Sequence, residues 1–313
     1  MTMPHYPAGT PLALRVKIWL LERGWLDLAL ALRRRMPVSF LWESAIALRL
    51  AMAGLVLRRR SYVNTRMGYR LNVLSDDPRA RLLEIRKGVT DPEAMRLWNK
   101  LLDAVRPTVV LDVGANYGEF TIPAALYRTV GRVIALEPNP DVARCLRRTV
   151  MDVSKVQVVT AAAGAYQGAA TLQLDDRGSG FGRISFEAVS GVRDTTVVVA
   201  LDDLGLKYSQ SVLLKVDVEG NELEVLEGAR HLFRGTTAAA LVEVHHLDAT
   251  ARQRLAQYIT DLGLQAFTWE LGRSRLIPLD TRAEVFLTGA NPNRYLKDIV
   301  VATADVSQSL TKA

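Results

Sequence analysis

The sequence predicts an α/β fold: a seven-stranded, mostly parallel sheet flanked by helices, preceded by a basic helical extension. Three observations lead to this expectation. The run Val109–Val113 is β-branched and aliphatic throughout, and glycines and a helical pattern follow it. Similar apolar runs recur along the chain with helical patterns between them, and strands that alternate with helices form parallel sheets. All the excess positive charge lies in the first 60 residues.

A glycine-rich turn follows the first predicted strand and indicates a ligand site. Gly114 lets the backbone turn sharply and approach a ligand, and Gly118 lets the next helix begin close to the strand. Free N–H groups at such a helix start attract carboxylate or phosphate. The spacing Gly-x-x-x-Gly after Asp112 differs from the dinucleotide pattern Gly-x-Gly-x-x-Gly. A plain buried turn between a strand and a helix is the alternative.

The second predicted strand, from Gly131, ends in the acid Glu137, 25 residues after Asp112. A carboxylate at the end of the neighbouring parallel strand can accept both hydrogen bonds of a ribose diol. Two prolines then end the strand, and we expect Asp141 to cap the following helix. The two strand ends together predict a nucleoside-binding site.

The segments VLDVGANYGEFT and GRVIALEPNP resemble those of the class I methyltransferases that depend on S-adenosyl-L-methionine (SAM). The run LKVDVEGNELEVLEG, residues 214–228, resembles the FkbM family among them, and the likeness spans about residues 82–290. The resemblance implies a Rossmann-like sheet, SAM as cofactor, and methylation of a hydroxyl on a sugar, glycolipid or polyketide-like acceptor. The cofactor-binding residues that it implies are Asp112, Gly114, Asn116, Gly118, Glu137, Ala162, Gly164 and Asp217.

Candidate catalytic residues lie at the carboxyl end of the fourth predicted strand, Ser211–Val218, and directly after it. Its period of two sends Lys215, Asp217 and Glu219 to one side. Polar residues rarely interrupt a buried strand except near its carboxyl end, where doubly wound sheets bind ligands. Asp217 occupies the motif position that faces the methyl group in the related folds. The resemblance therefore implies Asp217 as general base, with Lys215 and Glu219 orienting it or the acceptor. A local ion pair without a catalytic role is the alternative.

The fifth predicted strand, Ala238–His246, supplies a second candidate base. Alternation places Glu243 and His245 on one side and turns His246 away. The carboxylates and His245 could hold a divalent cation, but no ligand spacing demands one, so no metal is assigned.

Two further pairs of segments complete the predicted core. Ala169–Leu174 and Thr195–Ala200 alternate in the manner of a β-ribbon inserted before the fourth strand. Gln265–Trp269 and Glu284–Leu287 are expected to form the closing hairpin, which includes the one antiparallel strand.

Residues 1–60 carry ten Lys or Arg against three acids, a net charge of +7, while the remainder is neutral. Helices are expected at about Leu12–Arg34 and Val38–Arg59. The apolar stretch Leu41–Leu57 is not expected to span a membrane, because Arg49 at its middle costs roughly 2.5–3.5 kcal/mol on insertion. A basic amphipathic helix on an anionic membrane, and a helical cap or dimer contact, both stay open.

These patterns divide the chain into a basic extension (1–60), a transition segment (61–90), a methyltransferase domain (91–290) and a tail (291–313). A single cysteine and no expected signal peptide favour a cytoplasmic location, with peripheral membrane association open. The expected partners are a small-molecule or glycan acceptor, with a homodimer open and no nucleic acid. The rival functions are a non-catalytic SAM-binding scaffold and, less favoured by the glycine spacing, a nicotinamide-dependent oxidoreductase.

Overall fold

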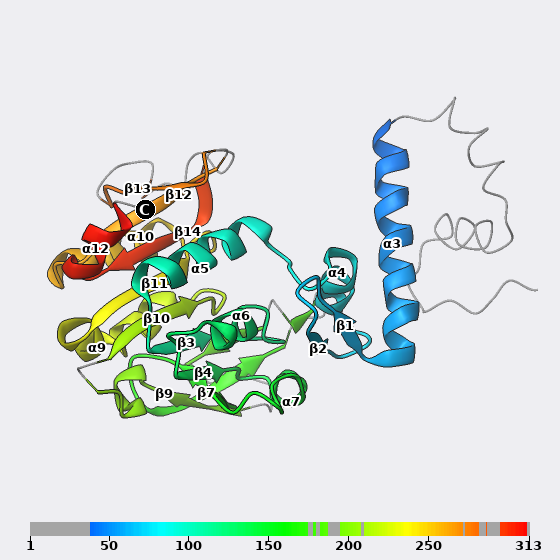
Figure 1. Ribbon diagram of the computed structural model, residues 1–313, viewed down its shortest axis with the longest axis horizontal. Helices are drawn as coiled ribbons and strands as arrows, with labels where there is room; N and C mark the ends of the chain where they lie inside the picture. Colours follow the sequence, from blue (N-terminus) through cyan, green and yellow to red (C-terminus); the bar gives the residue numbers. More distant parts are fainter. Residues whose placement is uncertain are drawn as a thin grey trace, which may run out of the picture.

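The computed structural model describes residues 38–174, 178–179, 182–186, 195–207, 210–271, 273–281, 286 and 295–311. An eight-stranded sheet forms the centre of this part of the chain (Figure 1). Its strands are β3 (Val109–Val113), β4 (Arg132–Leu136), β5 (Val156–Val159), β10 (Ser211–Val216), β11 (Thr237–Glu243), β12 (Gln265–Glu270), β13 (Arg275–Pro278) and β14 (Tyr295–Ala302). Their spatial order is β13-β12-β14-β11-β10-β3-β4-β5.

The five strands from β5 to β11 pair in parallel, as the apolar runs predict. On the other side of β11 the sheet is antiparallel: β14 lies between β11 and β12, and β13 pairs with β12 at the edge. The predicted α/β class is therefore confirmed. The described sheet has eight strands instead of seven because of the edge strand β13.

The closing antiparallel strand is not where the sequence placed it. The predicted segment Glu284–Leu287 lies outside the described residues except for Phe286, and β14 takes the expected place in the sheet. Its residues Ile299 to Ala302 are buried. Segment 291–313 is therefore not a tail, because it supplies an interior strand and the helix α12 (Ala304–Leu310). The charged Lys297 and Asp298 interrupt the apolar pattern that would have predicted this strand.

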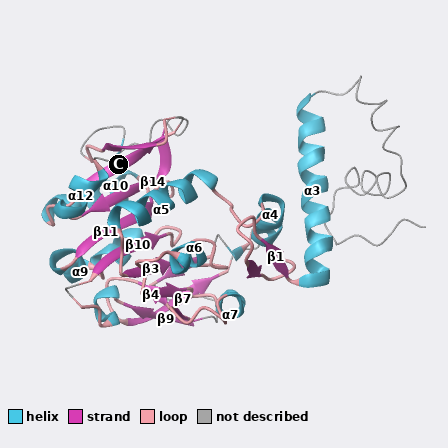
Figure 2. Ribbon diagram, in the orientation of Figure 1, coloured by secondary structure: helices cyan, strands magenta, loops and turns pink. Residues whose placement is uncertain are grey.

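Helices cover both faces of the sheet (Figure 2). One face packs against α5 (Pro92–Val105), α6 (Thr121–Leu126), α7 (Pro140–Thr149) and α12. The other face packs against α8 (Glu222–Glu227), α9 (Arg230–Gly235) and α10 (Ala249–Asp261). Asn139 caps α7 by accepting from the backbone N–H of Asp141, so Asp141 is not the cap as predicted. The helix begins at Pro140, which places Asp141 already inside its first turn.

A second, four-stranded sheet contains the predicted ribbon. Its strands are β6 (Ala162–Ala163), β7 (Gly168–Gln173), β8 (Arg183–Ser185) and β9 (Thr195–Val199). The antiparallel pair β7 and β9 forms its middle, with β6 and β8 at the edges. The alternating segments of the sequence therefore form the expected strands, although two further strands join them.

Segment 61–90 is packed against the domain that contains the large sheet. It forms β1 (Tyr62–Asn64), β2 (Arg70–Asn72) and α4 (Pro78–Arg86), which lie between α3 (Val38–Arg60) and the large sheet in Figure 1. Their apolar side chains form one core with Leu57 of α3 and with Tyr117 of the glycine turn. The hydroxyl of Tyr117 donates to Asp77 at 2.5 Å. Segment 61–90 therefore belongs structurally to the domain that follows it.

Helix α3 does not separate its apolar and polar sides as an amphipathic helix does. Met52 and Leu55 are about half exposed, whereas Leu57 is fully buried. No helix in the described part of the chain has the length and hydropathy needed to cross a bilayer. The first predicted helix lies outside the described residues, so membrane contact by residues 1–60 stays a prediction.

Leucines at two positions of α3 test whether its C-terminal turns are part of the domain. Leu57→Ala is expected to lower the free energy of unfolding by about 2–5 kcal/mol, because it leaves a cavity in the core shared with Tyr117. Leu55→Ala, in the same helix at 48% exposure, should change it by less than about 0.5 kcal/mol. Urea denaturation of both full-length variants measures the difference, and equal effects would contradict the packing.

Candidate active site

A pocket opens at the carboxyl ends of β3, β4 and β10, where doubly wound sheets bind their ligands. Residues from the glycine turn, the end of β4, the second sheet and α4 line it. They include Arg79, Gly114, Asn116, Glu137, Ala162, Leu172, Ser179, Ile184, Asp217 and Asn221. Five of the eight predicted cofactor-binding residues therefore lie here, whereas Asp112, Gly118 and Gly164 do not line the pocket.

Gly114 is fixed by a close approach between two strand ends. Its φ is +80°, and a Cβ atom built on it would lie 1.9 Å from the carbonyl oxygen of Asp217. No other residue fits there, because any side chain would force the end of β10 away. At Gly118 a Cβ would lie 2.6 Å from Leu146 of α7, so this glycine serves helix packing.

The predicted ribose acceptor, Glu137, is buried at the wall of this pocket. Its two carboxylate oxygens accept from the backbone N–H groups of Asn116 and Asn139, each at 2.9 Å. Each oxygen retains a further lone pair for a ligand hydroxyl. Burial is the main reason that the pKa of Glu137 is raised to about 7.

Asp112 occupies a different environment from the one predicted. Its carboxylate is 1% exposed and accepts a hydrogen bond from the hydroxyl of Thr121. Burial raises its pKa to about 6, against the opposing effects of Thr121 and Lys215. In this structure the carboxylate links β3 to the start of α6.

A second pocket adjoins the first and contains all five predicted catalytic residues. Its lining includes Arg79, Asp91, Phe120, Lys215, Asp217, Glu219, Glu243, His245, His246, Lys297 and Asp298. The two pockets share Arg79, Asp217 and Glu219. The ends of β10 and β11 therefore carry their ionisable side chains to the wall between two adjoining spaces.

Lys215 is the buried cation of this cluster. Its Nζ lies 3.2 Å from Asp217 Oδ2 and 3.9 Å from Asp298 Oδ1. Burial alone would lower the pKa of Lys215, but Asp217, Asp298 and Glu243 outweigh it and raise the pKa. Asp298 was not predicted as a site residue, because the strand that carries it, β14, was not predicted.

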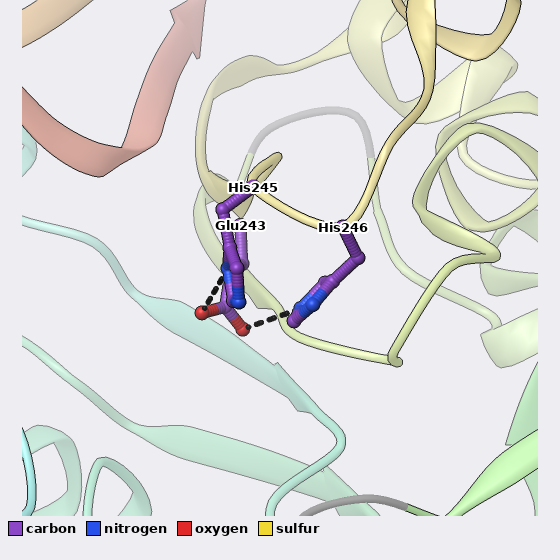
Figure 3. A group of neighbouring side chains, drawn as sticks. All are labelled: Glu243, His245 and His246. Carbon is purple, nitrogen blue, oxygen red and sulfur yellow. Dashed lines mark ion pairs between the residues drawn. The ribbon is translucent and has the colours of Figure 1, made fainter. Parts of the chain in front are cut away.

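Glu243 lies between two histidines (Figure 3). Nδ1 of His245 is 2.9 Å from Glu243 Oε1, and Nε2 of His246 is 3.2 Å from Oε2. The ring centroids of the two histidines are 3.5 Å apart. The prediction that His246 faces away is wrong, because β11 ends at Glu243 and the alternation of a strand does not continue to residue 246.

Asp217 and Glu243 share a hydrogen bond, and their pKa values move apart. Burial raises the pKa of Asp217 well above its ordinary value, and Glu243 adds to this against the charge of Lys215. Burial would also raise the pKa of Glu243, but its contacts with the rings of His245 and His246 and its hydrogen bond with Asp217 lower it. The shared proton is therefore held more strongly by Asp217 than by Glu243.

Arg79 is the main site residue that sequence reasoning missed. It lies on α4, before the segment that carries the recognisable motifs, and is the only cation among the described residues that line the first pocket. Its Nη2 lies 3.5 Å from Glu119 Oε2. Burial would lower the pKa of Arg79, but the neighbouring acids, Glu119 first, raise it. Arg79 is therefore a fixed positive charge between the two pockets.

Residues 112–266 match the family model described as the methyltransferase FkbM domain. This segment is an FkbM methyltransferase domain. The protein is therefore a methyltransferase, and its cofactor is SAM, as the resemblance in the sequence implied. No curated protein matches the chain.

Solved methyltransferase structures resemble parts of the fold. One is the precorrin-6y C5,15-methyltransferase from Geobacter metallireducens, 18% identical, with 69% of this chain and 90% of that chain covered and a TM-score of 0.37. Another is the O-methyltransferase from Bacillus cereus in complex with SAH, 13% identical, with 69% and 82% covered and a TM-score of 0.39. At these scores neither likeness bears on the substrate.

The raised pKa of Glu137 leads to a pH-dependent prediction for cofactor binding. Ribose hydroxyls donate more strongly to the ionised carboxylate, which forms above the folded-state pKa of about 7. Calorimetric affinity for SAM should therefore rise from pH 6 to pH 8 in the wild type. Glu137→Gln should bind roughly 10–100-fold more weakly at pH 8, as hydrogen bonds worth about 1.5–3 kcal/mol are weakened, and should lose this rise.

Asp112→Asn is the matched control, because it changes a buried acid outside the pocket. It should keep SAM affinity within about threefold and retain the pH dependence. The opposite pattern, with affinity lost only in Asp112→Asn, would remove Glu137 as the ribose acceptor.

Proposed function

We propose that this methyltransferase methylates a hydroxyl group, with the cofactor in the first pocket and the acceptor in the second. The observation that carries the proposal is the wall of Arg79, Asp217 and Glu219 that the two pockets share. Methyl transfer requires the two reactants in line and close together, and such positioning supplies roughly 7–11 kcal/mol. Adjoining pockets with ionisable groups at their junction suit this requirement.

The residues of the first pocket fit each part of SAM, which supplies an electrophilic methyl group on a sulfonium centre. Glu137 would accept the ribose hydroxyls, and Ala162, Leu172 and Ile184 offer apolar contact to the adenine. Arg79 would hold the carboxylate of the methionine end, because carboxylates pair well with a guanidinium. Gly114 also lines this pocket and has no side chain, so the ligand could approach its backbone closely.

His245 is the residue that we propose as general base. Its Nδ1 lies 2.9 Å from the carboxylate of Glu243, which would orient the ring and stabilise its protonated form. Its Nε2 would then accept the acceptor proton. Asp217, the base expected from the sequence, has a pKa that is raised by burial and by the hydrogen bond that it shares with Glu243, which favours a hydrogen-bond donor role for it.

The acceptor is proposed to be a sugar, glycolipid or polyketide-like hydroxyl. The FkbM resemblance supports this class, as does a second pocket lined mainly by charged and polar side chains. A lipid-linked acceptor would agree with the expected contact between residues 1–60 and an anionic membrane. That contact stays a prediction.

The test of the function is transfer of radiolabelled methyl from SAM to panels of glycans, glycolipids and polyketides. We expect label in an ether linkage that resists mild alkali. Label released by alkali would indicate a methyl ester and a carboxylate acceptor. Tight SAM binding without transfer to any acceptor would favour the non-catalytic scaffold.

Substitution of the proposed base gives a sharper test in the same assay. His245→Ala should lower turnover about 10²-fold or more with little change in SAM affinity. Because His245 is 37% exposed, added imidazole should restore part of the activity. His231→Ala, an exposed histidine of α9, is the control and should leave activity unchanged. Full activity of His245→Ala, together with loss of activity in Asp217→Asn, would show that Asp217 is the general base.

The role of Arg79 can be isolated by comparing two ligands: S-adenosylhomocysteine, which has the amino-acid carboxylate, and methylthioadenosine, which lacks it. Arg79→Gln should weaken binding of S-adenosylhomocysteine by about 10–100-fold, since a charged hydrogen bond of about 1.5–3 kcal/mol is lost. Binding of methylthioadenosine should change by less than about threefold. Arg81→Gln, on the same helix but outside the pocket, is the control. Equal weakening of both ligands would mean that Arg79 acts only through the fold.

A further inference from the structure

Four side chains at the ends of two adjacent strands converge, with His246 beside the three carboxylates where the sequence suggested His245. Asp217 and Glu219 follow β10, and Glu243 and His246 lie at the end of β11. Each offers one oxygen or nitrogen, and these four atoms all lie within 4.8 Å of one another. His246 belongs to this group because its ring turns toward Glu243, not away from it (Figure 3).

The spacing is close to that of the ligands of one ion. Ligands about 2.1 Å from an octahedral cation lie about 3.0 Å apart when adjacent and about 4.2 Å apart when opposite. Nε2 of His246 lies 3.2 Å from Glu243 Oε2, in the range for adjacent ligands. This nitrogen is buried and makes no hydrogen bond within the described residues, so its contact with the carboxylate is not a hydrogen bond.

The local charge also favours a cation. Among the described residues that line the second pocket, five are acids and three are Lys or Arg. The acids are Asp91, Asp217, Glu219, Glu243 and Asp298, and the bases are Arg79, Lys215 and Lys297. Once a bound cation displaces the proton that Asp217 and Glu243 share, this lining carries a formal charge of −2, counted without the histidines. One divalent cation would balance it.

We propose that Asp217, Glu219, Glu243 and His246 bind a divalent metal ion. Three carboxylates and one imidazole suit Mn²⁺ or a similar ion, since carboxylates favour Mg²⁺ and Mn²⁺ and imidazole favours the transition metals. His245, outside this set, stays free to accept a proton.

The metal would face the second pocket, where an acceptor oxygen could complete its coordination. Coordination lowers the pKa of a bound hydroxyl, so the proton would pass more readily to His245 Nε2. The oxygen would form its bond to the methyl carbon while the carbon–sulfur bond breaks, with its electron pair left on the sulfur of S-adenosylhomocysteine. This catalytic role rests on the proposed function. Binding of the ion does not, because the four ligands belong to the protein.

The experiment titrates Mn²⁺ into the full-length protein after treatment with EDTA and dialysis. Electron paramagnetic resonance of free Mn²⁺ measures binding without SAM or acceptor. We expect about one bound ion per chain, with affinity lowered at least about tenfold in His246→Gln and in Glu219→Gln. His231→Gln, an exposed histidine, should bind Mn²⁺ as the wild type does.

Thermal unfolding followed by circular dichroism, measured on the same samples, shows whether each variant is folded. A wild-type unfolding temperature with lost Mn²⁺ binding would support the site. No Mn²⁺ binding by the wild type at millimolar concentration would overturn the proposal, as would binding that both cluster variants leave unchanged. Failure to find methyl transfer, with Mn²⁺ binding intact, would overturn the proposed function and leave the metal site standing.

Discussion

The site depends on the close approach between Gly114 and the backbone of Asp217. The turn after β3 passes so near the end of β10 that not even a methyl group fits between them. This contact places the turn of the first pocket directly beside the carboxylate of the second. If the two strand ends were further apart, the pockets would not share a wall, and a donor in one could not reach an acceptor in the other.

Buried charge at this junction is stable only because its members compensate one another. Lys215 lies among Asp217, Asp298 and Glu243, and Glu243 in turn contacts both histidines. An isolated ion in the same place would cost several kcal/mol, so each group requires its partners. Three strands, β10, β11 and β14, contribute to this cluster. The charge network therefore fixes the relative positions of the strands whose ends form the site.

Much of this arrangement could be predicted from the sequence, because local patterns determine it. The β-branched runs gave the parallel strands, and acids at strand ends gave Glu137, Asp217 and Glu243. His246 and Arg79 were not predicted as site residues. The direction of His246 depends on where β11 ends, and the position of Arg79 depends on packing between segments far apart in the sequence. β14 was not predicted because charged residues such as Lys297 and Asp298 usually lie at the surface. Only the structure shows that Asp298 is buried beside Lys215. Periodicity describes single elements, whereas these residues are placed by contacts between elements.

The position of β14 has a consequence for folding of the domain. β14 follows β12 and β13 in the sequence yet lies inside the sheet, between β11 and β12. Until β14 is in place, β11 has an unpaired edge, and Asp298 is missing from beside Lys215. Exposed edges of this kind pair readily with other chains. A folding intermediate that lacks β14 is therefore vulnerable to aggregation, and the active site is complete only after β14 has entered the sheet.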